Sequence, residues 1–298
     1  MKFDFSDLIE KKLVIKKDYG DLSVYKYHRR VFFKAMWNTD ARLLDARGMV
    51  LDNNNEPVIW PFMKIFNRLE NGTDCDRDRP VVAVRKVNGF MAASSKHNNK
   101  TIVSTTGTLD SDFAVLARDI LDQHGDFTSR YVTHIFEIVD PSDPHIVAEK
   151  SGAWLIGCRD NYTGKLWTEA ELDAEAALWG FLRPEWHAVR FSDAVKMANE
   201  CTHEGYVIRA DTADQEMLMK IKSPHYLAKK FLMRMSNNKV VNMFADSQLI
   251  KQSIDEEFYP IVDAITSDFS LDMWQVLGAD HRRAYIEKLQ SGVLTCQN

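Results

Sequence analysis

One lysine and two acidic residues stand where apolar segments of the sequence begin, end or are interrupted. Lys86 lies between two short apolar runs, with Gly89 three positions further on. Glu137 interrupts a third apolar run, and Glu204 directly precedes a fourth. A carboxylate among apolar side chains is costly unless it is paired or functional. These positions could supply one amine nucleophile and two acids for a metal ion.

Three further cations could hold phosphate groups beside Lys86. Lys220 and Lys222 are two positions apart, so a strand would direct both side chains to one face. Arg47 precedes another apolar run. Taken singly, each residue also has an ordinary explanation: a solvated lysine in a turn, lysines on the wet face of an edge strand, or an arginine in a surface ion pair. Glu137 alone could be a buried acid paired with a core arginine.

The chemistry of Lys86 sets a condition on its surroundings. A lysine attacks phosphorus only as the neutral amine, and its usual pKa of about 10.4 leaves little neutral amine at neutral pH. Because nearby cations disfavour the ammonium form, Lys220, Lys222 and Arg47 are expected to lower the pKa of Lys86 while they hold a triphosphate. Mg²⁺, or Mn²⁺ in its place, would neutralise phosphate charge, and Glu204 is the first candidate to hold it.

The segments around these residues predict antiparallel sheets. Short runs with period-two or all-apolar patterns indicate strands, and Asn-rich stretches between them indicate hairpin turns. The expected strands are 22–27, 48–51, 81–84, 90–93, 101–104, 132–139, 154–158, 205–210 and 217–221. Helical spacing predicts helices at 110–124, 169–179 and 192–199.

After Pro224 no convincing strand pair occurs, and the spacing instead predicts helices at 226–235, 253–265 and 281–289. We therefore expect an α+β protein in two domains. Residues 1–226 would form antiparallel sheets with flanking helices, and residues 227–298 a small all-helical domain.

The composition is that of an ordinary globular protein: 45% of the 298 residues are hydrophobic and 27% are charged, which argues against disorder. The net charge of -5 provides no global basic field, so binding to nucleic acid would need a local patch. The four cysteines have neither Cys-x-x-Cys nor zinc-ligand spacing. Because no run of about 18 apolar residues occurs, a cytoplasmic protein is expected, neither exported nor membrane-spanning.

The order of these segments resembles the covalent nucleotidyltransferases, the superfamily of ligases and capping enzymes. The similar motifs are Lys86-x-x-Gly89, Phe136-Glu137, Trp154 to Arg159, Glu204-Gly205-Tyr206-Val207 and Lys220-Ile221-Lys222. Flanking features make the phage RNA ligase 1 type of ATP-dependent RNA ligase the closer match: Ala46-Arg47-Gly48, residues 61–67, and Ser223-Pro224-His225-Tyr226. The resemblance covers about residues 42–226.

The resemblance implies roles for single residues. Lys86 would carry the AMP, Glu137 would bind the nucleotide ribose, and Glu204 would organise the metal ion. Positions implied to bind the phosphates or the AMP, or to matter for activity, are Arg47, Lys64, Phe66, Asn88, Gly89, Lys220, Lys222 and Tyr226. Two positions depart from the phage pattern. Asn88 replaces the usual aspartate, as in fungal tRNA ligases, so metal–water contacts there are in question; Thr106 stands about where the phage enzyme has a lysine.

The implied fold is a nucleotidyltransferase domain of two antiparallel sheets flanking an ATP cleft. The implied reaction joins RNA 5′-phosphate and 3′-hydroxyl ends through lysyl-AMP and adenylated RNA, in RNA repair such as that of broken tRNA. RNA and an end-healing kinase or phosphatase are the implied partners. We expect a monomer in the cytoplasm, or in the host cytoplasm if the chain is phage-encoded.

Two alternatives remain open. A DNA ligase or an mRNA capping guanylyltransferase shares the lysine and the motif order, but these families usually place an OB-fold barrel after the last motif, where this sequence predicts helices. A non-catalytic RNA-binding relative would not need the reactive set of Lys86, Glu204, Lys220 and Lys222.

Overall fold

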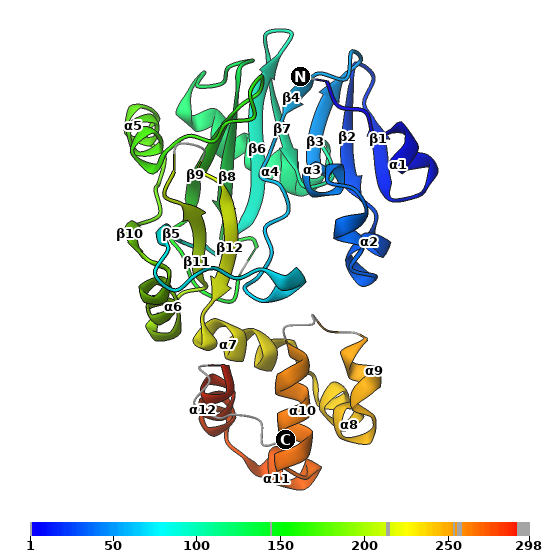
Figure 1. Ribbon diagram of the computed structural model, residues 1–298, viewed down its shortest axis with the longest axis vertical. Coiled ribbons are helices and arrows are strands. Elements are labelled where there is room, and N and C mark those ends of the chain that lie inside the picture. The colour runs from blue at the N-terminus through cyan, green and yellow to red at the C-terminus, as the bar shows by residue number, and fades with distance from the viewer. Residues whose placement is uncertain (1, 144, 213–214, 253, 255–257, 291–298) are drawn as a thin grey trace.

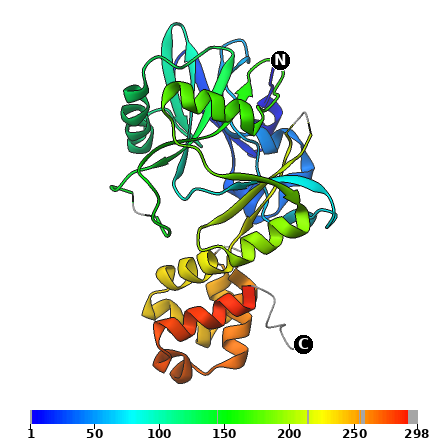
Figure 2. The ribbon, with the colours of Figure 1, turned by 90° about the vertical axis from the view of Figure 1, so that its left-hand side faces the viewer.

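The computed structural model describes residues 2–143, 145–212, 215–252, 254 and 258–290 (Figure 1). Three four-stranded antiparallel sheets form the larger part of the molecule, with strand orders β1-β2-β3-β4, β7-β6-β8-β9 and β10-β5-β11-β12. We call these the first, second and third sheet. Helices α7 to α12 follow as a separate lower body (Figure 2).

The first sheet is built from the N-terminal strands. Its strands are β1 (Val14–Asp18), β2 (Leu22–Tyr27), β3 (Arg47–Asp52) and β4 (Pro57–Ile59). The helical elements beside it are α1 (Ser6–Glu10), α2 (Arg29–Phe33), the 3₁₀ helix η1 (Met36–Thr39) and α3 (Arg42–Asp45). Apolar side chains such as Leu8, Val31, Leu43 and Met49 form the core between the helices and the sheet.

The second sheet carries Glu137. Its strands are β6 (Phe90–His97), β7 (Lys100–Thr105), β8 (Val132–Val139) and β9 (Gly152–Asp160). Helices α4 (Asp112–Leu121) and α5 (Glu169–Trp179) pack on it, and the 3₁₀ helix η3 (Asp122–His124) extends α4. Asn98 (φ 47°) and Asn99 (φ 60°) form the β6–β7 turn, so both central residues adopt the positive φ of a type I′ hairpin. The expected turn is confirmed.

The third sheet contains the strand that ends directly before the predicted nucleophile, Lys86. Its strands are β5 (Pro80–Arg85), β10 (Trp186–Arg190), β11 (Gly205–Ala210) and β12 (Met217–Lys222), and α6 (Phe191–Glu200) covers one face. The segment before β5 contains the 3₁₀ helix η2 (Glu70–Gly72) and runs beside β12, where Asn67 pairs with Lys220 in a parallel bridge.

The helical body has its own core. Its helices are α7 (Pro224–Arg234), α8 (Asn237–Ala245), α9 (Ser247–Lys251), α10 (Tyr259–Asp268), α11 (Leu271–Val276) and α12 (Ala279–Gln290). Phe231, Ile261 and Trp274 are among its buried side chains. Residues 253 and 255–257 of the helix expected at 253–265 lie outside the described residues. The division at residue 226 stays a prediction, because α7 runs across it.

All of the expected strands are present, but the described residues form three sheets and not the expected two. The first sheet was not expected as a unit because two of its strands have weak patterns. Only Val14 of β1 is buried, and β4 has three residues. The edge strand β10 was missed for the same reason, since none of its side chains is fully buried.

Among the described residues, no helix combines the length and apolar character needed to cross a membrane.

Candidate nucleotide-binding site

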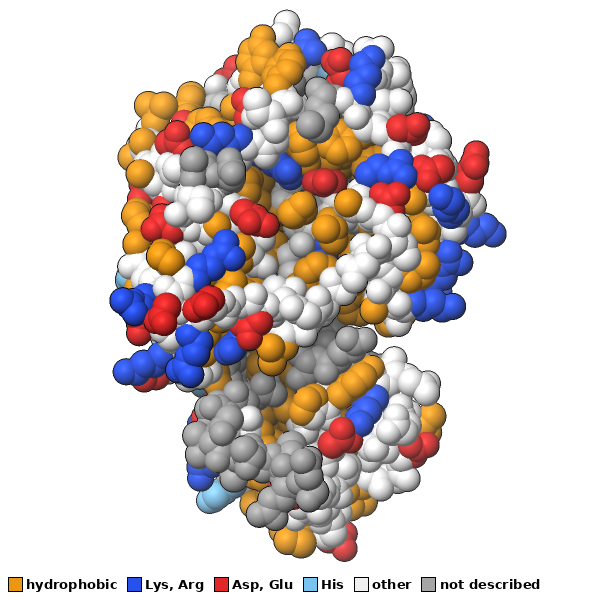
Figure 3. All heavy atoms as spheres, in the orientation of Figure 1, with side chains coloured by type: hydrophobic (Ala, Val, Ile, Leu, Met, Phe, Trp, Pro, Cys, Tyr) orange, Lys and Arg blue, Asp and Glu red, His pale blue; other side chains and the backbone are white. Residues whose placement is uncertain are grey.

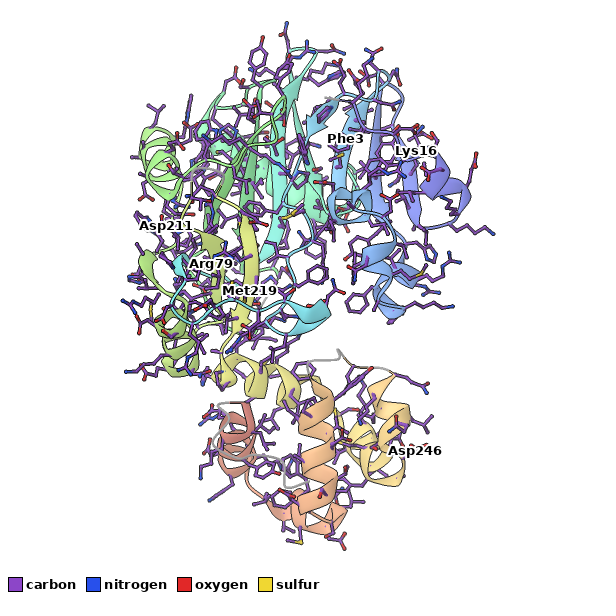
Figure 4. The ribbon with its side chains drawn as sticks, in the orientation of Figure 1. Phe3, Lys16, Arg79, Asp211, Met219 and Asp246 are labelled. Carbon is purple, nitrogen blue, oxygen red and sulfur yellow. The ribbon has the colours of Figure 1, made fainter. Side chains whose placement is uncertain are left out.

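A cleft of about 380 Å³ lies where residues from all three sheets meet. The predicted residues that line it are Arg47, Lys64, Lys86, Gly89, Glu137, Glu204, Lys220 and Lys222. Thr106, the position that departs from the phage pattern, also lines it. In Figure 4 the labelled Met219 marks β12 next to Lys220, and Arg79 marks the approach to β5. The volume falls in the range typical of small-molecule sites.

The pairing of β5 with β11 brings Lys86 to Glu204. The two strands are antiparallel with Arg85 opposite Tyr206, so the end of β5 meets the start of β11. The Lys86 N–H donates to the Gly205 carbonyl oxygen at 2.8 Å, and Lys86 Nζ lies 2.9 Å from Glu204 Oε2. Two residues that are 118 positions apart in the chain therefore form an ion pair in the cleft.

The direction of the pKa shift at Lys86 corrects the sequence-based expectation. Burial and Arg47 lower the pKa of Lys86, but the carboxylates of Glu204 and Glu137 raise it by more, so the pKa lies above its usual value. The lysine is thus held in its ammonium form in the absence of nucleotide. The pKa of Lys86 can fall below its usual value only when the effect of the Glu204 and Glu137 carboxylates on it is reduced.

Asn88 connects Glu204 to the β8–β9 loop. Its side-chain amide Nδ2 donates to Glu204 Oε2 at 2.7 Å, and its Oδ1 accepts from the Val147 N–H at 3.1 Å. An aspartate at this position could not donate to Glu204. The asparagine therefore orients the Glu204 carboxylate, although Asn88 itself does not line the cleft.

Gly89 and Glu137 join the second sheet to the lysine segment. The Gly89 N–H donates to Glu137 Oε1 at 3.1 Å, and a Cβ atom on Gly89 would collide with the Ile138 carbonyl oxygen. Glycine is therefore required for this close approach. Burial and the charge of Glu204 raise the pKa of Glu137 above its usual value, although Lys86 opposes the shift.

The lysine pair lies opposite Glu204 on the neighbouring strand. Lys222 pairs with Gly205 and Lys220 with Val207, which directs both lysines to the cleft. Gly205 has φ +128°, and a Cβ atom there would collide with the Ile221 carbonyl oxygen, so glycine lets β12 approach this closely. Burial, with the charges of Lys222 and Lys64 next in size, lowers the pKa of Lys220 to about 7.

Lys64 is held by aromatic rings and one acid. Its Nζ lies 5.7, 5.3 and 5.0 Å from the ring centroids of Phe32, Trp37 and Phe66, and it forms an ion pair with Glu70 Oε1 at 2.9 Å. Such cation–π contacts stabilise a partly buried ammonium group. Phe66, predicted at the nucleotide, lies outside the cleft lining and orients a residue that lines it.

Tyr226, predicted at the nucleotide, lies in the helical body. Its ring is buried in the core of the helical body, with 5% of the residue exposed, and it does not line the cleft. Lys222 Nζ lies 5.8 Å from the ring centroid. This contact links Tyr226 to a residue that lines the cleft.

The rest of the cleft wall is apolar and includes residues that the sequence analysis did not select. Phe62, Ile65, Met91, Ile156, Val207 and Met217 line it. Arg209, which is 1% exposed, lies at the same wall and forms an ion pair with Glu169. The alternation of β11 could have indicated Arg209, since residues 205, 207 and 209 share one face. The apolar wall suits a flat base, and the cations suit phosphates.

The donor groups fit a metal ion that arrives with a nucleotide. The described part of the chain contains no group of three or more His, Cys, Asp or Glu side chains that could hold a metal ion. Mg²⁺ is usually bound by one or two carboxylates together with substrate phosphates. Glu204, one of two carboxylates in a cleft that cations also line, matches that arrangement, and its role at a metal stays a prediction.

The fold and the cleft define a ligase-type nucleotidyltransferase, and comparison with known proteins agrees. Residues 45–231, more than half of the chain, match the RNA ligase family. The chain belongs to this family, which confirms the resemblance seen in the sequence. A comparison with curated proteins gave no match.

Solved structures show the same fold at low sequence identity. A protein from Aquifex aeolicus assigned as an ATP-dependent DNA ligase aligns with TM-score 0.56 and 15% identity, over 96% of this chain and 75% of that chain. An archaeal ATP-dependent RNA ligase in form 2 aligns with TM-score 0.55 and 13% identity, over 97% of this chain and 76% of that chain. These alignments confirm the α+β nucleotidyltransferase fold.

Proposed function

We propose that the chain is an ATP-dependent RNA ligase that joins 5′-phosphate and 3′-hydroxyl ends through an AMP carried by Lys86. Family membership supports the reaction class. The observation that carries the residue assignment is the position of Lys86 Nζ, 2.9 Å from Glu204 in a cleft that Arg47, Lys64, Lys220 and Lys222 also line.

In the first step the cations would hold the triphosphate while the base lies on the apolar wall. Lys86 Nζ must give up one proton, and Glu204 Oε2 is the acceptor already hydrogen-bonded to it. The neutral amine then attacks the α-phosphorus, and the bond to pyrophosphate breaks. A divalent ion, Mg²⁺ or Mn²⁺, would when bound neutralise charge on the phosphate oxygens, and Glu204 would hold it.

In the later steps the AMP passes to an RNA 5′-phosphate, and the RNA 3′-hydroxyl attacks that activated phosphate and expels AMP. Repair of broken RNA such as tRNA, with a kinase or phosphatase that first heals the ends, is the biological role we propose. A monomer in the cytoplasm, or in the host cytoplasm for a phage-encoded chain, completes the proposal.

The test is transfer of label from α-labelled ATP or GTP to the protein. We expect an ATP-specific adduct that is stable to base and labile to acid, located on Lys86 by mass spectrometry, and absent from Lys86→Ala. Lys96→Ala is the matched control, because Lys96 pairs with Asp126 away from the cleft. A GTP adduct would indicate a capping enzyme, and no adduct a non-catalytic relative.

Substrate choice is tested separately. The labelled protein is offered single-stranded RNA, nicked RNA and nicked DNA, each with a 5′-phosphate and a 3′-hydroxyl. Joining of RNA ends supports the proposal, whereas joining of DNA alone would make the enzyme a DNA ligase.

A further inference from the structure

A second cavity of about 670 Å³ adjoins the nucleotide cleft, and Lys64, Lys220 and Lys222 line both. We call it the junction chamber, because it lies where the sheets meet the helical body. Its other walls come from residues 67–71, from α6, from Leu227 of α7 and from Pro260 of α10. Figure 1 shows η2 directly above α7, and Figure 3 shows the surface narrowing at this level.

The charged side chains of the chamber favour an anion. Among the described residues that line it, Lys64, Arg68, Lys220 and Lys222 are cations and Glu70, which is paired with Lys64, is the one carboxylate. Arg68 pairs with Asp74 at 3.1 Å, but 35% and 41% of these side chains are exposed, so the pair is weak. The guanidinium of Arg68 is therefore able to bind a phosphate group.

The position of Arg68 is fixed by its backbone. The Arg68 N–H donates to the Lys220 carbonyl oxygen, and the Lys220 N–H donates to the Phe66 carbonyl oxygen, both at 2.9 Å. The guanidinium also lies 5.4 Å from the ring centroid of Phe191. A phosphate bound by Arg68 would thus lie in the cavity that adjoins the lysine pair.

Other groups in the chamber suit contacts with a sugar and a base. The triphosphate of ATP contains neither, so these groups favour a nucleic acid strand. Three amides line it, those of Asn67, Asn71 and Asn199. Amides can donate to and accept from ribose hydroxyls. Leu69, which is 70% exposed, provides an apolar surface at the edge.

We infer that the junction chamber binds the RNA strand that receives AMP, through its phosphates and riboses. This inference rests on the proposed function. The cations would bind the RNA backbone, and the amides would bind the 2′-hydroxyls. Because the chamber shares a wall with the nucleotide cleft, the RNA end would lie beside Lys86. Because Leu227 of α7 and Pro260 of α10 line the chamber, the RNA would also contact the helical body.

The test compares Arg68→Gln and Asn71→Gly with Arg190→Gln. Asn71 has φ 53°, which glycine adopts without strain, so Asn71→Gly removes the side chain and its hydrogen bond to Asn38 Oδ1 without straining the folded backbone. Arg190 is the matched control, because it forms an exposed ion pair with Asp78 at 2.9 Å and lines neither cavity. Two quantities are measured: binding of a 5′-phosphorylated oligoribonucleotide by fluorescence anisotropy, and single-turnover transfer of AMP from preformed lysyl-AMP to that RNA.

We expect Arg68→Gln to weaken RNA binding roughly tenfold, as for the loss of one charge-assisted contact. The slope of log affinity against log salt should fall by about 0.7, the value for one phosphate of a single strand. AMP transfer should slow at subsaturating RNA, whereas the KM for ATP in lysyl-AMP formation stays unchanged. Asn71→Gly should reduce the preference for RNA over DNA of the same sequence.

Other outcomes overturn the inference. Unchanged RNA binding in Arg68→Gln excludes the chamber, and a raised KM for ATP in the same variant would assign it to the triphosphate tail. An equal loss in Arg190→Gln would indicate only diffuse surface charge. If the wild-type protein forms no lysyl-AMP while Arg68→Gln still weakens RNA binding, the proposed function fails and the RNA site stands.

Discussion

Lys86 Nζ and Glu204 Oε2 lie 2.9 Å apart, and this ion pair holds the predicted nucleophile in its unreactive ammonium form. The same carboxylate oxygen also accepts the Asn88 amide. The resting site therefore protects Lys86 from adventitious reaction. Adenylation requires that the carboxylate release the amine when a triphosphate enters.

Glu204→Gln separates two roles of the carboxylate: raising the pKa of Lys86 and supporting metal-dependent lysyl-AMP formation. Removing its charge takes away the largest effect that raises the pKa of Lys86, so the pKa falls. We expect Lys86 to react faster with trinitrobenzenesulfonate at pH 7, by about tenfold for each pKa unit lost. Metal-dependent lysyl-AMP formation should fall by at least about 100-fold. Peptide mapping by mass spectrometry measures the first effect and label transfer the second.

The matched control for this variant is Glu149→Gln. Glu149 is equally buried and pairs with Arg85 at 2.7 Å, next to Lys86 in the sequence. Reactivity of Lys86 that does not rise in Glu204→Gln, or that rises as much in Glu149→Gln, would show that the ion pair does not control the nucleophile.

Asn88→Asp tests why this chain carries an amide where phage ligases have an acid. The aspartate can still accept from Val147 but would place a second carboxylate 2.7 Å from Glu204, at the distance of the present hydrogen bond. We expect a loss of stability of about 1–3 kcal/mol without divalent ions, from the lost buried contact, and recovery when Mg²⁺ is added. Thermal unfolding with and without Mg²⁺ measures both.

Asn161→Asp serves as the control for Asn88→Asp. Asn161 is buried, and its amide donates to the Val58 and Arg130 carbonyl oxygens. This variant should lose stability without recovering it in Mg²⁺. Equal recovery in both variants would mean that the metal acts elsewhere.

The strands whose bounds the sequence predicted best include two central strands, each of which pairs with a strand on both sides. β8 and β11 have the predicted bounds, because their apolar runs are buried in a sheet. β1 and β10 expose most of their side chains, so their sequences carry little of the alternation that marks a half-buried strand. Packing partners, which the local sequence does not contain, decide that they pair.

The candidate site was also predictable only in part. The order of the motifs predicted that Lys86, Glu204 and Lys220 meet in one cleft, and all three line it. The sign of the pKa shift at Lys86 was not predictable, because it depends on the distance to a carboxylate that is 118 positions away. The motif pattern also did not indicate that Tyr226 is buried in the core of the helical body.

Phe66→Leu tests whether the aromatic rings around Lys64 help to bind ATP. The ring centroid of Phe66 is the nearest of the three to Lys64 Nζ, at 5.0 Å. Leucine keeps an apolar side chain but removes the cation–π contact, which contributes about 0.5–2 kcal/mol. We expect the KM for ATP in lysyl-AMP formation to rise by about two- to thirtyfold, with a smaller change in the rate at saturating ATP.

Phe181→Leu is the control for Phe66→Leu. Phe181 is buried among aromatic rings of the second sheet, so its loss reports the general cost of removing a ring from the core. If both variants change the KM for ATP equally, the effect is one of stability. If Phe66→Leu leaves the KM unchanged, Lys64 does not depend on this ring.

Lys220 should make ATP binding depend on pH above neutrality. Burial, together with Lys222 and Lys64, lowers the pKa of Lys220 to about 7, and a bound phosphate would raise it again. Between these two pKa values the complex holds more protons than the free protein. ATP affinity should therefore fall as pH rises from 7 to 9, by at most about tenfold per pH unit.

Lys220→Arg identifies the titrating group, since a guanidinium stays charged throughout this range. We expect the variant to bind ATP with little pH dependence between pH 7 and 9, even where its planar fork binds phosphate less well than lysine does. Lys96→Arg, on β6 outside the cleft, should keep the wild-type profile. Titration calorimetry at pH 8 in buffers of different ionisation enthalpy should show proton uptake by wild type and not by Lys220→Arg. An unchanged profile in Lys220→Arg would assign the titration to another group.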